Sequence, residues 1–223
     1  RTSIRLLVPD SAWYPVPMRI AQVGALVLAG AIAPSATFAW TAALEAPPAA
    51  MVADSLCDVL AAVPRPGRRY RTVSDVVKLD GRSGRVRWRH PIRVAGRGQD
   101  TVVKVLTPIG DADVVVAGPV KSPEERGILV ARLGGRDGSE SWRRLLRGSA
   151  SHPVLEEATA VAVDPDGDVV VGGSLGNTFS GDYGALSVAK LDGRDGTEQW
   201  RFSLRESLRA DVLAVDARGD VVA

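Results

Sequence analysis

The stretch VAKLDGRDGTEQW (residues 188–200) has two earlier versions in this 223-residue chain, VVKLDGRSGRVRW (76–88) and VARLGGRDGSESW (130–142). Each copy is an apolar run, then a glycine-containing turn, then a tryptophan. The tryptophans that end the copies are spaced by 54 and 58 residues: Trp88, Trp142 and Trp200. A nearly constant period of this size indicates a repeat architecture.

A second motif precedes each copy and keeps the same phase. Its clearest form is AVAVDPDGDVVVGGS (160–174), and weaker copies occur at 51–63, 102–118 and 212–223. At the position of Cys57 in the copy at 51–63, the copies at 160–174 and 212–223 have glycine. The aspartates that open the second half of the motif are 55, 55 and 52 residues apart: Asp58, Asp113, Asp168 and Asp220. The two motifs therefore define one repeating unit.

Each unit predicts four short strands. Apolar, β-branched runs of about 4–7 residues are bounded by Gly and Asp, which is typical of strands joined by tight turns. In the third unit the turns are DPDGD (164–168) and DGRDG (192–196), and the last strand alternates apolar and polar residues from Trp200 onward. Four-stranded units with a tryptophan signature indicate the blades of a β-propeller. We therefore predict an all-β fold built from antiparallel four-stranded blades.

The third unit also resembles a known family. AVAVDPDGDVVVGGS followed by GDYGALSVAKLDGRDGTEQW (181–200) resembles the bacterial seven-bladed β-propeller repeat. LDGRDGTEQW (191–200) is similar to the tryptophan-docking repeat of pyrroloquinoline-quinone-type propellers. The resemblance covers about residues 50–223 and implies that the tryptophans lock neighbouring blades together.

The same resemblance bears on cofactors. For quinone-dependent enzymes of this type it implies an adjacent cysteine pair, calcium ligands and a catalytic aspartate in a complete ring. This chain has a single cysteine. We therefore expect no quinone cofactor.

The expected organisation places the repeats behind an export signal. After Met18 and Arg19 no charged residue occurs before Glu45. The apolar run that follows Arg19 is about 14 residues long and leads to small residues, as in a secretion signal. We predict a signal peptide at 18–39, leave open that it stays as an uncleaved membrane anchor, and assign no role to residues 1–17.

Blades are expected at 50–88, 101–142 and 158–200, with a further blade beginning at 211–223. The chain stops inside the second strand of that last unit, whereas closed rings need about four to eight blades. This predicts an incomplete propeller of about three and a fraction blades, with the missing blades of the same protein as its partners. An export signal predicts a secreted, periplasmic or cell-surface location.

Charge is unevenly distributed along the units. The net charge of +2 gives no indication of nucleic-acid binding. The turns that join the first to the second strand and the third to the fourth are rich in aspartate. The other loops hold more arginine: Arg65, Arg68, Arg69, Arg71, Arg93, Arg97, Arg126, Arg147, Arg205 and Arg209. An arginine-rich face could receive an anionic partner; the alternative is that these arginines are simply solvated.

Candidate chemical sites are few. Asp164, Asp166 and Asp168 have the i, i+2, i+4 spacing of calcium ligands, but no acidic ligand follows at the spacing of a calcium loop, so a turn role is favoured. His90 and His152 are the only histidines and occupy non-equivalent positions. We predict no catalytic residue, metal or cofactor.

These observations favour a non-enzymatic binding or scaffold module. Its ligand, a protein or a glycan, would meet the loops at one rim or the central funnel. One alternative is a quinoprotein-like enzyme whose catalytic residues lie beyond Ala223. Another is a cell-surface structural or adhesion protein.

Overall fold

A computed structural model of the chain describes residues 4–5, 42, 44–66, 72–94, 100–110, 112–121, 126–148, 156–175, 186–204 and 212–223. Every regular element in these ranges is a β-strand, which confirms the predicted all-β class. None of these residues belongs to a helix long and apolar enough to cross a membrane. The predicted signal at 18–39, the loop around 176–184 and His152 lie outside the described ranges.

Three consecutive units each form a four-stranded antiparallel sheet, which we call a blade. Blade 1 contains β2 (Ala50–Ala53), β3 (Val59–Pro66), β4 (Thr72–Leu79) and β5 (Val86–Ile92). Blade 2 contains β7 (Val105–Ile109), β8 (Asp113–Lys121), β9 (Arg126–Leu133) and β10 (Glu140–Leu146). Blade 3 contains β11 (Glu156–Val163), β12 (Val169–Leu175), β13 (Leu186–Leu191) and β14 (Glu198–Leu204).

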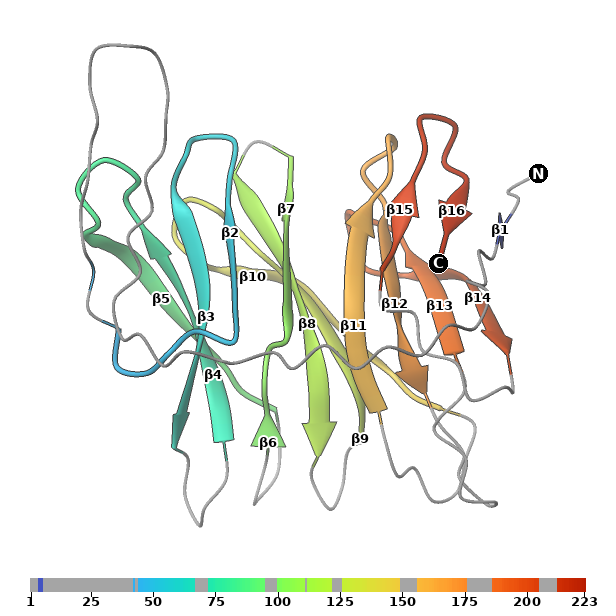
Figure 1. Ribbon diagram of the computed structural model, residues 1–223, viewed down its shortest axis with the longest axis horizontal. Helices are drawn as coiled ribbons and strands as arrows, with labels where there is room; N and C mark the ends of the chain where they lie inside the picture. Colours follow the sequence, from blue (N-terminus) through green and yellow to red (C-terminus); the bar gives the residue numbers. More distant parts are fainter. Residues whose placement is uncertain are drawn as a thin grey trace, which may run out of the picture.

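Short strands complete the architecture. β15 (Ala214–Val215) and β16 (Val221–Val222) form a hairpin beside blade 3, and β1 (Ile4–Arg5) pairs with β16 in parallel. β6 (Asp100–Thr101) bridges β4 of blade 1 and β8 of blade 2. The blades therefore follow one another in chain order, as Figure 1 shows from blue-green to red.

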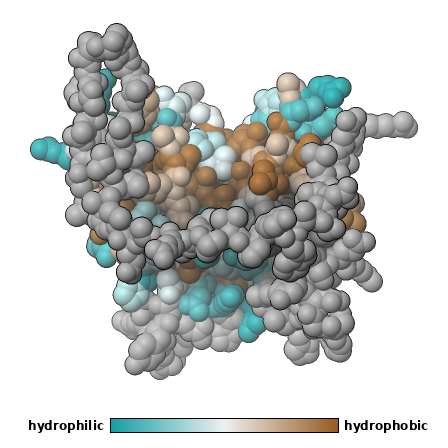
Figure 2. Space-filling view, in the orientation of Figure 1, coloured by the Kyte–Doolittle hydropathy of each residue, from teal (hydrophilic) through white to brown (hydrophobic). Residues whose placement is uncertain are grey.

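The first strands of the blades stand in a row. β7 contacts both β2 and β11, and β11 also contacts β15. In the view of Figure 1 the turns from β2 to β3, β4 to β5, β7 to β8 and β11 to β12 all lie at the upper end. We call this the turn end of the molecule. Figure 2 shows apolar side chains gathered in the middle of the same view.

The core lies between the blades rather than inside any one of them. Val114 and Val116 of β8 belong to the cluster shared with blade 1, whereas Val115 and Ala117 belong to the cluster shared with blade 3. Successive side chains of a strand point to opposite faces, so a strand covered on both sides must be apolar at consecutive positions. This explains the unbroken apolar run of each second strand.

The two outer blade faces are also covered. Val59, Ala61, Val63, Val77 and Leu79 form the outer face of blade 1, against which Ala42, Leu44, Ala46 and Met51 pack. The outer face of blade 3 contains Val170, Leu186 and Val188, and the β15–β16 hairpin covers it through Leu213, Val215 and Val221.

Candidate functional site: the polar clusters that join the blades

Aspartate side chains close the turn between the first and second strands. Asp164 Oδ1 accepts hydrogen bonds from the backbone N–H groups of Asp166 and Asp168 at 3.0 and 2.9 Å. Asp54 in blade 1 and Asp216 in the β15–β16 hairpin accept the equivalent pairs of hydrogen bonds. A side-chain oxygen that holds the backbone two residues on is the usual reason for aspartate in a turn.

The last aspartate of this turn connects it to the turn between the third and fourth strands. Gly135 N–H donates to Asp113 Oδ1 at 2.8 Å, and Gly193 N–H donates to Asp168 Oδ1 at 3.0 Å. A Cβ atom on Gly135 or Gly193 would lie 1.8 or 1.9 Å from a backbone carbonyl oxygen of the other turn. Only glycine fits there, which explains the glycine that recurs after the third strand.

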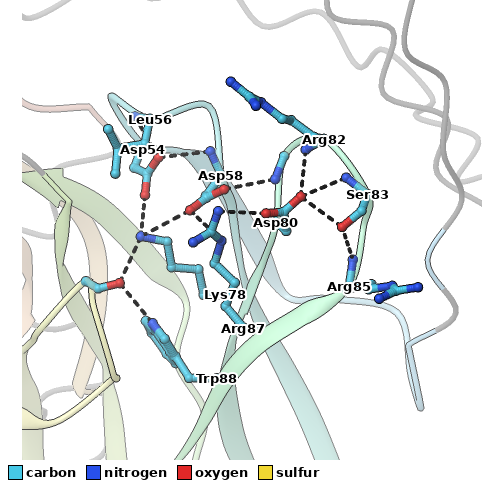
Figure 3. A network of polar contacts seen from close by, with 12 residues as sticks. Asp54, Leu56, Asp58, Lys78, Asp80, Arg82, Ser83, Arg85, Arg87 and Trp88 are labelled. Carbon is cyan, nitrogen blue, oxygen red and sulfur yellow. Dashed lines mark hydrogen bonds and ion pairs between the residues drawn. The ribbon is translucent and has the colours of Figure 1, made fainter.

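A basic residue near the end of the third strand completes each cluster. Lys78 Nζ lies 2.7 Å from Asp54 Oδ2 and 3.6 Å from Asp58 Oδ2, as Figure 3 shows. Lys190 repeats these ion pairs with Asp164 and Asp168 at 2.6 and 3.1 Å. In blade 2 Arg132 takes this position and pairs with Asp113 at 2.8 Å. Buried carboxylates need such partners because an unpaired buried charge is costly.

The same basic residues reach the next blade. Lys78 Nζ and Trp88 Nε1 both donate to the carbonyl oxygen of Gly135, at 2.9 and 3.0 Å. Arg132 Nη1 and Trp142 Nε1 both donate to the carbonyl oxygen of Gly193, at 2.6 and 3.0 Å. The junction of blades 1 and 2 and the junction of blades 2 and 3 therefore each have two donors on one blade and one shared acceptor on the next.

The indole rings lie against a second glycine of the same turn. Gly138 and Gly196 have positive φ angles of 73°, which favour glycine. A Cβ atom on Gly138 would lie 2.6 Å from Cε3 of Trp88, and one on Gly196 would lie 2.6 Å from Cε3 of Trp142. The turn is thus shaped to receive a flat ring.

Trp200 lies in different surroundings. It is partly buried and packs on the outer face of blade 3 with Leu204, Leu213 and Val215. Its own blade keeps the Lys190 ion pairs, but the described residues include no later turn of the kind that receives Trp88 and Trp142. Of the three tryptophans that end the repeat motifs, the structure thus places Trp88 and Trp142 between complete blades.

A further set of contacts, on the outer strands, was not predicted. Arg201 pairs with Glu198 at 2.6 Å and donates to the carbonyl oxygen of Arg147 in the preceding blade at 2.6 Å. Arg143 repeats this with Glu140 and the carbonyl oxygen of Arg93. In blade 1 the equivalent Arg89 pairs instead with Asp75 and with Glu45 of the segment that covers the outer face. The recurring Trp-Arg dipeptide is the sequence signal for these contacts.

Two members of the arginine-rich loop set lie in strands, not in loops as predicted: Arg126 is the exposed first residue of β9, and Arg65 belongs to β3. Arg65 lies within β3, with its Nε atom 2.7 Å from Asp75 Oδ1 on the adjacent strand β4. It is held by a cross-strand ion pair and does not project from a loop. Arg68, Arg69, Arg71, Arg97, Arg205 and Arg209 lie outside the described ranges.

The surroundings of Asp168 and Asp80 lower the pKa of each carboxyl group. Burial raises the pKa of Asp168, but hydrogen bonds from Gly193, Gln199 and Lys190 outweigh it and leave the pKa below its usual value. Burial lowers the pKa of Lys190, but its bonds to Asp164 and Asp168 outweigh that effect and raise it. Hydrogen bonds from the side chain and backbone of Ser83 lower the pKa of Asp80 to about 2.

The residues of the turn with calcium-ligand spacing do not fit calcium. In the turn with the spacing of calcium ligands, backbone N–H groups take Asp164 Oδ1, and the ammonium group of Lys190 lies against Asp164 Oδ2 and Asp168 Oδ2. No group of three or more His, Cys, Asp or Glu side chains within the described ranges is arranged to hold a metal ion. His90 lies 3.8 Å from Glu140, and the only cysteine, Cys57, lies exposed in a turn.

Blades with tryptophan-to-turn junctions define a β-propeller of the pyrroloquinoline-quinone type. The family model described as outer membrane protein assembly factor BamB matches residues 30–223, and the chain belongs to that family. A comparison with curated proteins finds no match. The family match confirms the resemblance seen in the repeat motifs.

Proposed function

We propose that this chain is a non-catalytic scaffold or binding module of the cell envelope that serves the assembly of outer membrane proteins. The family description supports this process, and the predicted export signal at 18–39 supports the location. The partner would be a protein that meets the loops or turns at the ends of the blades, because variable segments on a rigid scaffold are where binding usually resides.

The main support for the proposal is that the titratable groups of the repeated clusters are bonded to one another and to the backbone of neighbouring turns. Asp58, Asp113 and Asp168 each accept a backbone N–H of the neighbouring turn and face a basic side chain of the same blade. Those basic side chains in blades 1 and 2 are in turn bound to the next blade. Groups with all their bonds committed to blade packing support a rigid scaffold rather than acid–base chemistry.

The proposal predicts a defect in the envelope when the protein is missing. A deletion strain should contain less β-barrel protein in its outer membrane fraction, measured by quantitative mass spectrometry, and the wild-type gene should restore the amount. An epitope-tagged copy should appear in the envelope fraction. Normal β-barrel levels, or a tagged protein confined to the cytoplasm, would contradict the proposal.

A second measurement separates this proposal from the quinoprotein-like alternative. The purified full-length protein is incubated with pyrroloquinoline quinone and calcium, and dye-linked dehydrogenase activity is followed with a panel of alcohols and sugars. We expect no turnover, because the donor set of the described turns is taken up by lysine and backbone groups. Quinone-dependent turnover would favour the enzyme.

A further inference from the structure

The turn end of blade 1 differs from the same region of blades 2 and 3. Leu56, in the turn between β2 and β3, is 64% exposed, and Val86, the first residue of β5, is 54% exposed. Counted from the first aspartate of the turn, Leu56 corresponds to Asp166 in blade 3. Counted back from the tryptophan, Val86 corresponds to Glu140 and Glu198. Blade 1 thus exposes aliphatic side chains where its neighbours have acidic ones.

The charge of blade 1 is also reversed. Its turn between the third and fourth strands holds Arg82 and Arg85, with Asp80 as the only acid, and Arg87 follows in β5. The equivalents of Arg85 are Ser139 and Thr197. Arg87 is paired with Asp58 and Asp80, at 3.1 and 2.6 Å.

The other two guanidinium groups are available. Figure 3 shows the side chains of Arg82 and Arg85 pointing away from the polar network. Both residues are exposed, and neither forms an ion pair within the described part of the chain. They can therefore meet a partner without breaking a contact of the fold.

The equivalent turns of blades 2 and 3 carry no net positive charge: Asp137 offsets Arg136, and Asp192 and Asp195 outweigh Arg194. Hydrogen bonds from the backbone and side chain of Ser139 lower the pKa of Asp137, and hydrogen bonds from the side chain and backbone of Thr197 lower the pKa of Asp195. Glu140 and Glu198 lie close behind them, each paired with an arginine of its own strand. The basic and apolar character is therefore confined to blade 1.

The two turns of blade 1 form one continuous surface. Gly81 N–H donates to Asp58 Oδ1 at 2.9 Å, and a Cβ atom on Gly81 would lie 1.8 Å from the carbonyl oxygen of Cys57. This contact holds the turn that carries Leu56 directly against the turn that carries Arg82 and Arg85, and Val86 follows that turn as the first residue of β5. The apolar and basic groups are thus presented together on a rigid base.

We propose that this surface, formed by Leu56, Arg82, Arg85 and Val86, binds an acidic protein segment that also carries apolar side chains. The inference rests on the proposed binding function and names its surface and partner class. Carboxylates of the segment meet the free guanidinium groups, while its aliphatic side chains cover Leu56 and Val86.

A membrane surface is the less suitable partner. An extended layer of anionic headgroups would also approach the exposed, ionised carboxylates of Asp137 in blade 2 and Asp195 in blade 3 and be repelled by them. Charges interact over about 8–10 Å at ordinary ionic strength. A narrow peptide segment can occupy blade 1 alone and avoid that repulsion.

The test uses the full-length protein and a fluorescein-labelled peptide of sequence Glu-Glu-Leu-Glu-Glu-Val-Glu-Glu, with a peptide in which lysine replaces each glutamate as its counterpart. Fluorescence anisotropy should show binding of the acidic peptide only, and affinity should fall as salt rises. The double variant Arg82→Glu/Arg85→Glu should weaken binding at least about 10-fold, and Leu56→Ser/Val86→Ser should weaken it as well. Arg136→Glu, at the position equivalent to Arg82 in blade 2, is the matched control and should bind like the wild type.

Three results would overturn the inference. These are equal binding by Arg82→Glu/Arg85→Glu, an equal loss in the Arg136→Glu control, and binding of phosphatidylglycerol vesicles in place of the peptide. All substituted positions are exposed, in the turns of blade 1, at the start of β5 or, for Arg136, in a turn of blade 2, so unchanged melting temperatures should show that each variant is folded.

The deletion strain separates this inference from the proposed function. If the wild-type gene and the Arg82→Glu/Arg85→Glu gene restore β-barrel levels equally, the function stands and the surface is wrong. If deletion leaves β-barrel levels normal while the variant still loses peptide binding, the surface stands and the assembly function is wrong.

Discussion

Lys78 in blade 1 and Lys190 in blade 3 occupy the same position of the repeat but differ in their surroundings. Both are held between two aspartates of their own blade, yet the Lys78 side chain is 2% exposed and that of Lys190 is 16% exposed. Lys78 also donates to Gly135 of the next blade. The comparison shows that the repeat sequence sets the contacts inside a blade, whereas burial depends on the neighbouring blade.

We expect the largest effect from removing a tryptophan that is buried by a neighbouring blade. Trp142→Ala should cost about 4–5 kcal/mol of unfolding free energy, because it removes a buried ring and leaves a cavity at the junction. Trp200→Ala should cost clearly less, since Trp200 is only partly buried. Urea unfolding followed by circular dichroism measures both, and equal losses would show that the two tryptophans share one kind of junction.

Substitution of Lys78 and of Lys190 should also cost different amounts of unfolding free energy, with a smaller effect than at the tryptophans. Lys78→Met should cost about 3–4 kcal/mol, because it leaves the buried carboxylate of Asp54 without its counter-ion. Lys190→Met should cost less, because water reaches its site more easily. A double variant that also carries Asp54→Asn should recover part of the Lys78→Met loss. No recovery would indicate that Lys78 acts through its bond to Gly135 alone.

The pH dependence of stability should reveal the Asp168–Lys190 pair. The folded-state pKa of Asp168 is lowered, so its contribution is present above the unfolded value of about 3.9 and is lost as the pH falls through the folded pKa. The folded-state pKa of Lys190 is raised, so its contribution is present below about 10.4 and is lost as the pH rises through the folded pKa. The stability gap between wild type and Lys190→Met should therefore narrow at both extremes. A gap that does not change with pH would exclude the ion pair as its source.

The smallest effect concerns the first turn of blade 1. Cys57 has a positive φ of 61°, whereas the equivalent Gly167 in blade 3 has a φ of 82°. Because this left-handed conformation is strained for residues other than glycine, Cys57→Gly should stabilise the protein by about 0.5–1 kcal/mol. Gly167→Cys is the matched reverse change. Nothing lies within 4 Å of the added Cβ atom, so no steric clash adds to the backbone strain, and the loss of stability should be of similar size. Chemical unfolding of both variants measures the pair, and a loss of stability in Cys57→Gly would contradict the alignment of the two turns.

Much of the fold could be predicted because its elements are local. Short apolar runs and Asp/Gly turns predicted the strands, and even the divergent turn with Cys57 keeps the hydrogen bonds of the turn with Asp164. The family match from residue 30 onward confirms the assignment based on the repeat motifs.

The contacts between blades were less predictable. Sequence alone does not say that Lys78 and Trp88 share one carbonyl oxygen 47 residues beyond the tryptophan. Nor does a count of aspartates show that many are neutralised inside the clusters, so that the charge of a turn depends on a few exposed residues such as Arg85. Both facts depend on which turns the folded chain brings together.

The arrangement of donors and acceptors has a consequence for how such chains can change in length. Blades 1 and 2 each supply a tryptophan and a basic side chain to the next blade, and blades 2 and 3 each supply the glycine turn that receives them. A gene duplication that copies one whole unit therefore copies both halves of a junction, and the inserted blade fits its neighbours without any compensating substitution. Evolution can then alter the exposed turns of a single blade while the packing between blades is inherited unchanged.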